Sequence, residues 1–151
     1  MENNFTAVIK EVAPQNIISI RKVISLSDFD SIYAELGAMI QSKNLNISGA
    51  PIAIYHDQDF NPDGNDTELA FPVSEVTEDT TILPAGTYAT TICKGSFDKL
   101  PTYYDLLCKW ISKNNYQIVG APFEQYIHEP ESVSTSEDFI TEIFFKVEKN
   151  S

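Results

Sequence analysis

The sequence predicts an α+β domain built from two β-α-β-β units, and three observations carry this prediction. The 151 residues suffice for one domain with a sizeable buried core, but not for two full-sized domains. The chain also repeats itself at a nearly constant shift. Within each copy, strand-like alternation gives way to helical spacing and then returns. We therefore expect a single domain over residues 1–151 with an internal repeat, about 1–77 and 78–151.

The repeat is clearest over residues 33–55, which align without a gap to residues 104–126 at a shift of 71 residues, a register kept through 23 positions. This shift pairs Tyr33 with Tyr104, Leu36 with Leu107, Ile40 with Ile111, Asn44 with Asn115, Gly49-Ala50-Pro51 with Gly120-Ala121-Pro122, and Tyr55 with Tyr126. Farther along, a shift of 74 residues pairs Thr67 and Glu68 with Thr141 and Glu142. Three extra residues in the second long loop account for the change. Two copies of one sequence unit indicate two copies of one structural unit.

Each unit opens with a strand and a helix. Two runs rich in β-branched residues predict the strands, Ile17–Ile24 and Tyr88–Cys93. Apolar residues at helical spacing predict the helices that follow, from Ile32 to Ile40 and from Tyr103 to Ile111. Ser27 or Asp28 suits the N-cap of the first helix, and Pro101 is tolerated in the first turn of the second.

Further strands are expected around each Gly-Ala-Pro segment, joined by long polar loops over residues 57–66 and 129–138. Residues 6–12 and 80–83 are expected to add a strand each. Two such units can pair about a pseudo-two-fold axis into one antiparallel sheet with both helices on one face. The other face would then be an open groove.

Alternation along the strands predicts which side chains enter this groove. Glu124 and Tyr126 share one face of their strand, and Phe123 lies on the other. On the last strand, Ile143, Phe145 and Val147 belong under the helices, which leaves Glu142 and Phe144 for the groove. The expected ligand-binding residues are Glu142, Tyr126, Glu124, Tyr55, Glu68, Phe144 and Tyr88.

Carboxylates beside aromatic rings are suited to binding an amphipathic aromatic cation. A cation within about 6 Å of a ring centroid gains roughly 0.5–2 kcal/mol. A desolvated carboxylate adds an attraction that a solvated one cannot supply. The pattern predicts a small-molecule receptor, but it does not rank Glu68 against Glu142.

Composition restricts the partners. The formal net charge is −12, the sequence pI is about 4.4, and Lys and Arg do not cluster. A duplex-binding protein needs a basic face, so no direct nucleic-acid partner is expected. No signal peptide or run of 18 apolar residues occurs, so no membrane partner is expected either.

The two cysteines, Cys93 and Cys108, form neither a disulfide framework nor a zinc site. We therefore expect no metal, no cofactor and a cytoplasmic protein.

Several motifs in order resemble one known family. They are Leu83-Pro84-Ala85-Gly86-Thr87-Tyr88-Ala89, Lys94-Gly95-Ser96-Phe97, Trp110-Ile111, Tyr116 to Pro122, Tyr126 and Thr141-Glu142-Ile143. This order resembles the GyrI-like small-molecule-binding domain, which is also the effector-binding domain of many bacterial AraC-type and MerR-type multidrug regulators. The resemblance covers almost the whole chain. One departure is Lys146, which stands where the family and Pro72 of the first copy have proline, so the end of the last strand is expected to differ.

The resemblance implies the duplicated fold and a groove in which a buried glutamate and several aromatic residues recognise amphipathic cations. Glu142 matches the glutamate of the family's late Thr-Glu motif, and Glu124 and Tyr126 match the preceding strand. Since no helix-turn-helix segment precedes the domain, we expect a stand-alone binding module.

Two alternatives stay open. Some stand-alone relatives resemble hydrolases that open cyclopropane rings of DNA-alkylating compounds; Glu142 or Glu124 would then be the general base. The family name also admits a protein partner, such as gyrase or a transcription regulator.

Overall fold

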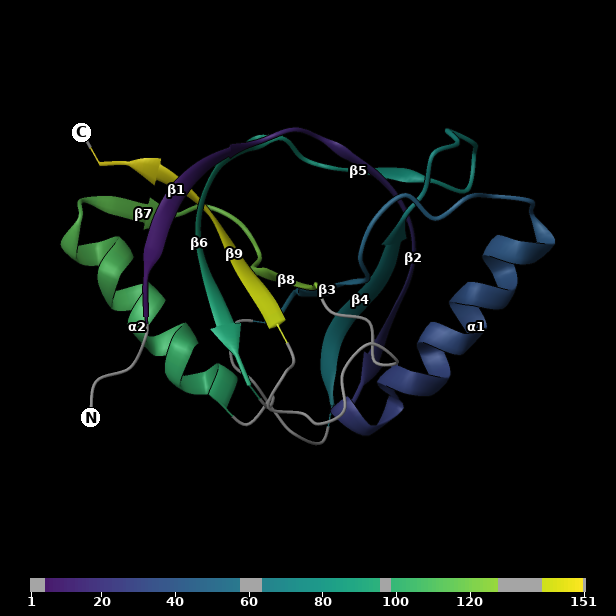
Figure 1. The fold of residues 1–151 in the computed structure, drawn as a ribbon, viewed down its shortest axis with the longest axis horizontal. Coiled ribbons are helices and arrows are strands. Elements are labelled where there is room, and N and C mark those ends of the chain that lie inside the picture. The colour runs from purple at the N-terminus through teal and green to yellow at the C-terminus, as the bar shows by residue number, and fades with distance from the viewer. Residues whose placement is uncertain (1–4, 58–63, 96–98, 128–139, 151) are drawn as a thin grey trace. The chain divides into compact units, whose positions relative to one another are not determined.

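A computed structural model describes residues 5–57, 64–95, 99–127 and 140–150 (Figure 1). These residues form the helices α1 (Phe29–Ser42) and α2 (Leu100–Lys113) and a short 3-10 helix, η1 (Leu26–Asp28). The strands are β1 (Ala7–Val12), β2 (Gln15–Ile24), β3 (Ile52–Tyr55), β4 (Asn65–Pro72), β5 (Thr81–Leu83), β6 (Gly86–Lys94), β7 (Tyr116–Ile118), β8 (Phe123–Tyr126) and β9 (Ile140–Lys149). The expected α+β class is confirmed. Most of both long polar loops lies outside the described residues.

The chain divides into two compact units. Residues 13–85 form the first-copy unit, in which antiparallel strands pair in the order β3-β4-β2-β5. Residues up to Val12 and from Gly86 onward form the second-copy unit, with the order β1-β6-β9-β8 and β7 also on β9. These boundaries differ from the sequence repeat near residue 77. The reason is that β1 pairs with β6 of the second copy, whereas β5 pairs with β2 of the first.

Both helices end in the same way, which explains one repeated residue. Asn44 and Asn115, each two residues beyond the last residue of α1 or α2, have positive φ angles of 58° and 67°. Asparagine adopts this left-handed conformation more readily than most residues and commonly ends a helix. At the start of α1, Asp28 is the N-cap residue, but its carboxylate accepts a hydrogen bond from the Ser25 amide instead of capping the helix. Neither helix among the described residues is long and apolar enough to cross a membrane.

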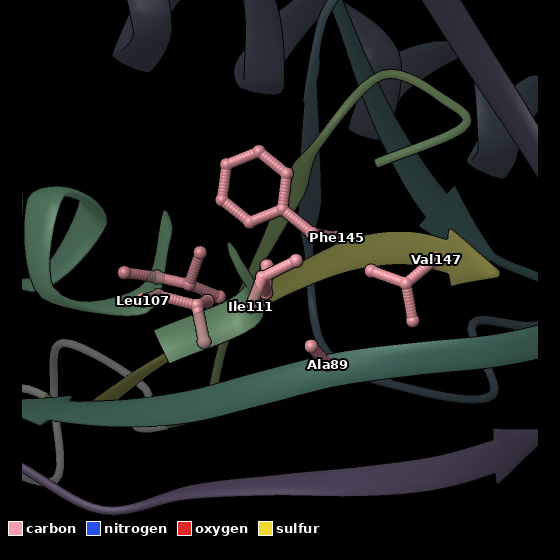
Figure 2. Packing of buried hydrophobic residues seen from close by; sticks show 6 residues of the cluster. Ala89, Leu107, Ile111, Phe145 and Val147 are labelled. Carbon is pink, nitrogen blue, oxygen red and sulfur yellow. The ribbon is translucent and has the colours of Figure 1, made fainter. Parts of the chain in front are cut away.

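The core of the second-copy unit lies between α2 and one face of β6 and β9. Figure 2 shows Leu107 and Ile111 of α2 beside Ala89 of β6 and beside Phe145 and Val147 of β9. All five are buried, as is Ile143, which completes the cluster. We call the face that carries these strand residues the α2 face, and the other side of the same strands the opposite face.

The first-copy unit repeats this packing. Ile18 of β2 and Leu36 and Ile40 of α1 form its buried cluster, together with Val73. The ring of Tyr33 meets that of Phe71 edge-on, with centroids 5.5 Å apart. The equivalent rings in the second copy, Tyr104 and Phe145, meet at 5.7 Å. The helix-to-sheet contact is therefore duplicated along with the sequence.

The two copies differ where their last strands end. In the first copy β4 ends at Pro72, whereas β9 continues through Lys146 to Lys149. Proline has no backbone N–H to donate a hydrogen bond to a neighbouring strand. Lysine at the equivalent position has one, which lets β9 continue and pair with β7. In the first copy the strand expected before Gly49 is reduced to a single bridge between Ile47 and Val73.

Candidate functional site

A buried glutamate lies between two tyrosines on the α2 face. Glu124 of β8 is 3% exposed. Its two oxygens accept hydrogen bonds from different hydroxyls: Tyr104 of α2 donates to Oε2 at 2.8 Å, and Tyr126 donates to Oε1 at 2.7 Å. Burying a carboxylate costs several kcal/mol unless strong hydrogen bonds compensate it. The two short O–H···O bonds supply such compensation.

Comparison of the two copies shows that only the second copy has a glutamate at this position of the repeated core. At the equivalent position the first copy has Ala53, which is 0% exposed. There the hydroxyl of Tyr33 donates to the backbone carbonyl of Ile52 at 2.7 Å. In the second copy the equivalent hydroxyl, on Tyr104, donates to the Glu124 side chain instead. The second copy thus has a charged group at the position where the first copy packs a methyl group.

The expectation that Glu124, Tyr126, Glu142 and Phe144 share one groove face is wrong. Antiparallel partners project their side chains to the same face, and Glu124 is the register partner of Ile143, on the α2 face. Glu142 pairs with Gln125 and therefore projects to the opposite face. The alternation of side chains along a strand does not fix the register between that strand and its neighbour. A shift of one residue in this register moves every side chain of the strand to the other face of the sheet.

Three aromatic rings gather on the opposite face. Phe123 and Phe144 stack in parallel, with ring centroids 4.4 Å apart and planes 9° apart. Tyr88 meets Phe123 and Phe144 edge-on, at 5.6 Å and 6.0 Å. Tyr88 and Phe144, two of the expected site residues, therefore lie in contact, together with Phe123, which sequence reasoning had assigned to the other face. We call these three residues the aromatic trio.

Burial of Tyr88 leads to a prediction for its ionisation. Desolvation raises the pKa of its phenol above the ordinary value of 10.0, because burial disfavours the phenolate. The folded protein therefore retains this proton more strongly than the unfolded chain does. The stability from the neutral phenol is fully present below pH 10 and is lost as the pH rises through the folded-state pKa.

A titration followed by tyrosinate absorbance should include a late phase above the ordinary range, and its amplitude should be smaller in Tyr88→Phe. The alkaline loss of stability should also become smaller in that variant. A titration with no late phase, or the same late phase in both proteins, would contradict the assigned burial.

Glu142 also lies on the opposite face, and it forms an ion pair. Lys10 of β1 donates from Nζ to Glu142 Oε2 at 2.7 Å. Glu142 is 8% exposed, whereas the Lys10 side chain is 45% exposed. The charge on Glu142 is therefore compensated by a lysine that arises two strands away in the sheet.

The first copy places its two expected residues on different faces. Tyr55 is the register partner of Thr67, and Glu68 is the partner of Ile54 and Arg21, so their side chains project to opposite sides. Glu68 accepts a hydrogen bond from Ser19 Oγ and lies 3.0 Å from His56 Nε2. The equivalent glutamates Glu68 and Glu142 thus have unlike partners, a serine and a histidine in one case and a lysine in the other.

Sequence reasoning missed three residues of these arrangements. Tyr104 was placed on the apolar stripe of a helix, Phe123 was assigned to the face opposite the expected groove, and Lys10 was not considered. A signal for the first was present in the repeat: Glu124 replaces Ala53 within a duplicated buried strand, so some donor had to accompany it. No comparable signal indicates Lys10, because its partner lies 132 residues away in sequence.

Comparisons with known proteins identify the class of domain to which this fold belongs. Residues 6–148 match the GyrI-like small-molecule-binding domain. The chain belongs to the GyrI-like family. No curated protein matches the sequence.

Solved structures extend the comparison. The C-terminal domain of EcmrR is 25% identical, with a TM-score of 0.90, and the match covers 97% of this chain and 99% of that domain. In the complex of EcmrR with DNA the identity is 26% and the TM-score 0.88; the match covers 96% of this chain but only 58% of that one. SAV2435 bound to tetraphenylphosphonium is 16% identical with a TM-score of 0.65, covering 95% and 94% of the two chains, and this likeness shows the fold alone.

Proposed function

We propose that this protein binds amphipathic aromatic cations on the α2 face of the second-copy unit, with Glu124 as the anionic partner. The observation that carries this proposal is a carboxylate, 3% exposed, held between the hydroxyls of two tyrosines. The role of Glu124 and Tyr126 in ligand binding was expected from the sequence, and Tyr104 joins them here.

The chemistry of this arrangement favours a cation over a neutral or anionic ligand. Opposite charges attract more strongly away from water, so a cation brought beside Glu124 gains more than it would beside a solvated carboxylate. The rings of Tyr104 and Tyr126 offer π faces that add a cation–π attraction. An amphipathic compound would also bury apolar surface beside Phe145, whose ring contacts Tyr104.

Entry of such a ligand requires a rearrangement, because Glu124 is buried. Tyr104 belongs to α2 and Tyr126 to β8, so a ligand that reaches the carboxylate must displace at least one hydroxyl and move part of α2 away from β8. The hydroxyl bonds would be exchanged for an ion pair. The other expected residues, Glu142, Phe144, Tyr88, Tyr55 and Glu68, lie outside this arrangement, and their role in ligand binding stays a prediction from the sequence alone. The cytoplasm remains the proposed location.

Tetraphenylphosphonium and tetraphenylborate provide a direct test, since the two ions have nearly the same shape and opposite charge. The choice of cation follows from the SAV2435 complex. We expect calorimetric titration of the protein to show saturable binding of the phosphonium, at least about tenfold tighter than that of the borate. Equal affinity for both ions, or binding of neither, would contradict the proposal.

A further inference from the structure

A short ribbon that follows α2 carries an open strand edge. Residues 116–118 of β7 pair antiparallel with residues 147–149 of β9, and we call these two segments the β7 ribbon (Figure 1). In the part of the chain that the structure describes, no strand pairs with the other side of β7. An open edge presents backbone N–H and C=O groups to which another chain can add a strand. The β7 ribbon is therefore a candidate surface for a peptide.

The backbone of β7 directs hydrogen-bonding groups toward this open edge. The amide of Val119 donates to the carbonyl of Lys146 at 2.8 Å, so Val119 is directed toward β9. Successive residues of an antiparallel strand direct their backbone groups to alternate sides. Ile118 and Tyr116 therefore direct theirs away from β9. An extended peptide placed along β7 would meet these groups.

The side chains of the ribbon are more apolar and more basic than those at the equivalent positions of the first copy. Val119 corresponds to Ser48 at the shift of 71 residues, and Lys149 corresponds to Glu75 at the shift of 74. Ile118 and Val119 are 42% and 40% exposed. Many edge strands are protected by proline or charged residues, but β7 carries neither. The ribbon thus exposes aliphatic side chains beside its open edge.

The first copy occupies the corresponding segment with its own side chains. The Glu75 carboxylate accepts hydrogen bonds from the backbone amide and the side-chain amide of Asn46, at 2.8 Å and 2.6 Å. Asn46 is the counterpart of Gln117 in the middle of β7. Lys149 cannot accept a hydrogen bond, and its Nζ lies 5.6 Å from the ring centroid of Tyr116 instead. In the second copy an exposed ammonium therefore stands where the first copy uses a carboxylate internally.

Positive charge is concentrated around β7 in an otherwise acidic protein. Lys113 is the last residue of α2, and Lys146 and Lys149 lie near the end of β9, so three of the ten basic residues of the chain surround β7. Glu148 is the one acidic residue of the β7 ribbon, whereas the chain as a whole has a net charge of −12. An acidic ligand is repelled by most of such a protein and attracted to its basic patch.

We propose that β7 is a docking edge for an acidic peptide segment in extended conformation, which adds to the sheet as a further strand. The peptide backbone hydrogen-bonds with Tyr116 and Ile118. Its acidic side chains pair with Lys149, and its apolar side chains pack on Ile118 and Val119. This site does not contain Glu124 and goes beyond the proposed binding of small cations.

The test uses a fluorescein-labelled hexapeptide that alternates glutamate with valine, titrated against the full chain by fluorescence polarisation. We expect saturable binding. A second peptide carries lysine in place of glutamate, which reverses the charge. A third is N-methylated at its two central residues, which removes backbone donors but keeps the side chains. Both altered peptides should bind at least about tenfold more weakly than the first.

A charge reversal in the protein locates the site. Lys149→Glu introduces the residue of the first copy and should weaken binding of the acidic peptide at least about fivefold. Lys22→Glu is the matched control, because it reverses the charge of a lysine on β2 whose side chain is 49% exposed. It should change the affinity by less than about twofold. Glu124→Gln should also leave peptide binding unchanged, which separates this test from that of the proposed function.

Three results would overturn the docking edge: no binding of the acidic peptide, equal binding of the N-methylated peptide, or equal affinity of the unaltered and Lys149→Glu proteins. Sedimentation velocity provides a further check on the occupant. Self-association of the protein that is lost in Lys149→Glu would assign the edge to a second copy of this chain, and it would overturn the proposal as well.

Discussion

Glu124→Gln is expected to weaken tetraphenylphosphonium binding by about 10- to 100-fold. The substitution removes the charge while preserving the size of the side chain and its capacity to hydrogen-bond with Tyr104 and Tyr126. An interaction with a charged group in a desolvated site contributes about 1.5–3 kcal/mol, and each 1.4 kcal/mol corresponds to a factor of ten in the dissociation constant. Titration of both proteins at one ionic strength measures the difference.

Two matched variants make this measurement specific. Glu148→Gln removes the same charge from the exposed end of β9 and should leave the affinity unchanged within about twofold, since exposed charges are screened. Glu142→Gln removes a buried charge from the opposite face and should have a much smaller effect than Glu124→Gln. Equal losses in all three variants would indicate that only net charge matters, and the assignment of Glu124 would then be wrong.

Leu107→Ala is expected to destabilise the protein by about 2–5 kcal/mol. Leu107 is 0% exposed and belongs to the buried cluster that α2 forms with Ala89 and Val147 of the sheet, so its truncation leaves a cavity in this cluster (Figure 2). Leu36→Ala, the equivalent change in the first copy, should cost a similar amount because Leu36 is equally buried. Urea unfolding monitored by circular dichroism gives both values.

Cys108→Ala provides the control for this prediction. Cys108 is the next residue on α2 but is exposed, so its replacement should change the free energy of unfolding by no more than about 0.5 kcal/mol. A Leu107→Ala protein as stable as Cys108→Ala would show that α2 does not pack on the sheet in the way described.

The repeat allowed most of the fold to be predicted from the sequence. Paired residues such as Leu36 and Leu107 occupy equivalent buried positions, and Asn44 and Asn115 end equivalent helices. The buried positions and the helix ends both depend on nearby residues in the sequence. The spacing of apolar residues determines which side of a helix is buried, and few residues other than glycine and asparagine accept a positive φ. The difference between Pro72 and Lys146 likewise predicted that the last strands would end differently.

The candidate site was only partly predictable, for a physical reason. Periodicity shows that Glu124 and Tyr126 share a face, but the face that β8 turns toward α2 depends on its register with β9. Similarly, Lys10 meets Glu142 only because β1 joins the second-copy unit, a pairing set by contacts far apart in sequence. Long-range pairing leaves no local pattern, so these residues required the structure.

A crystal structure of the protein with tetraphenylphosphonium would test the assignment of the ligand to Glu124 most directly. We predict that the phosphonium will have Glu124 as its nearest carboxylate and that the Tyr104 hydroxyl will have left that carboxylate. A complex in which Glu124 keeps both tyrosine bonds while the cation lies beside Glu142, Glu68 or an exposed acid would contradict it.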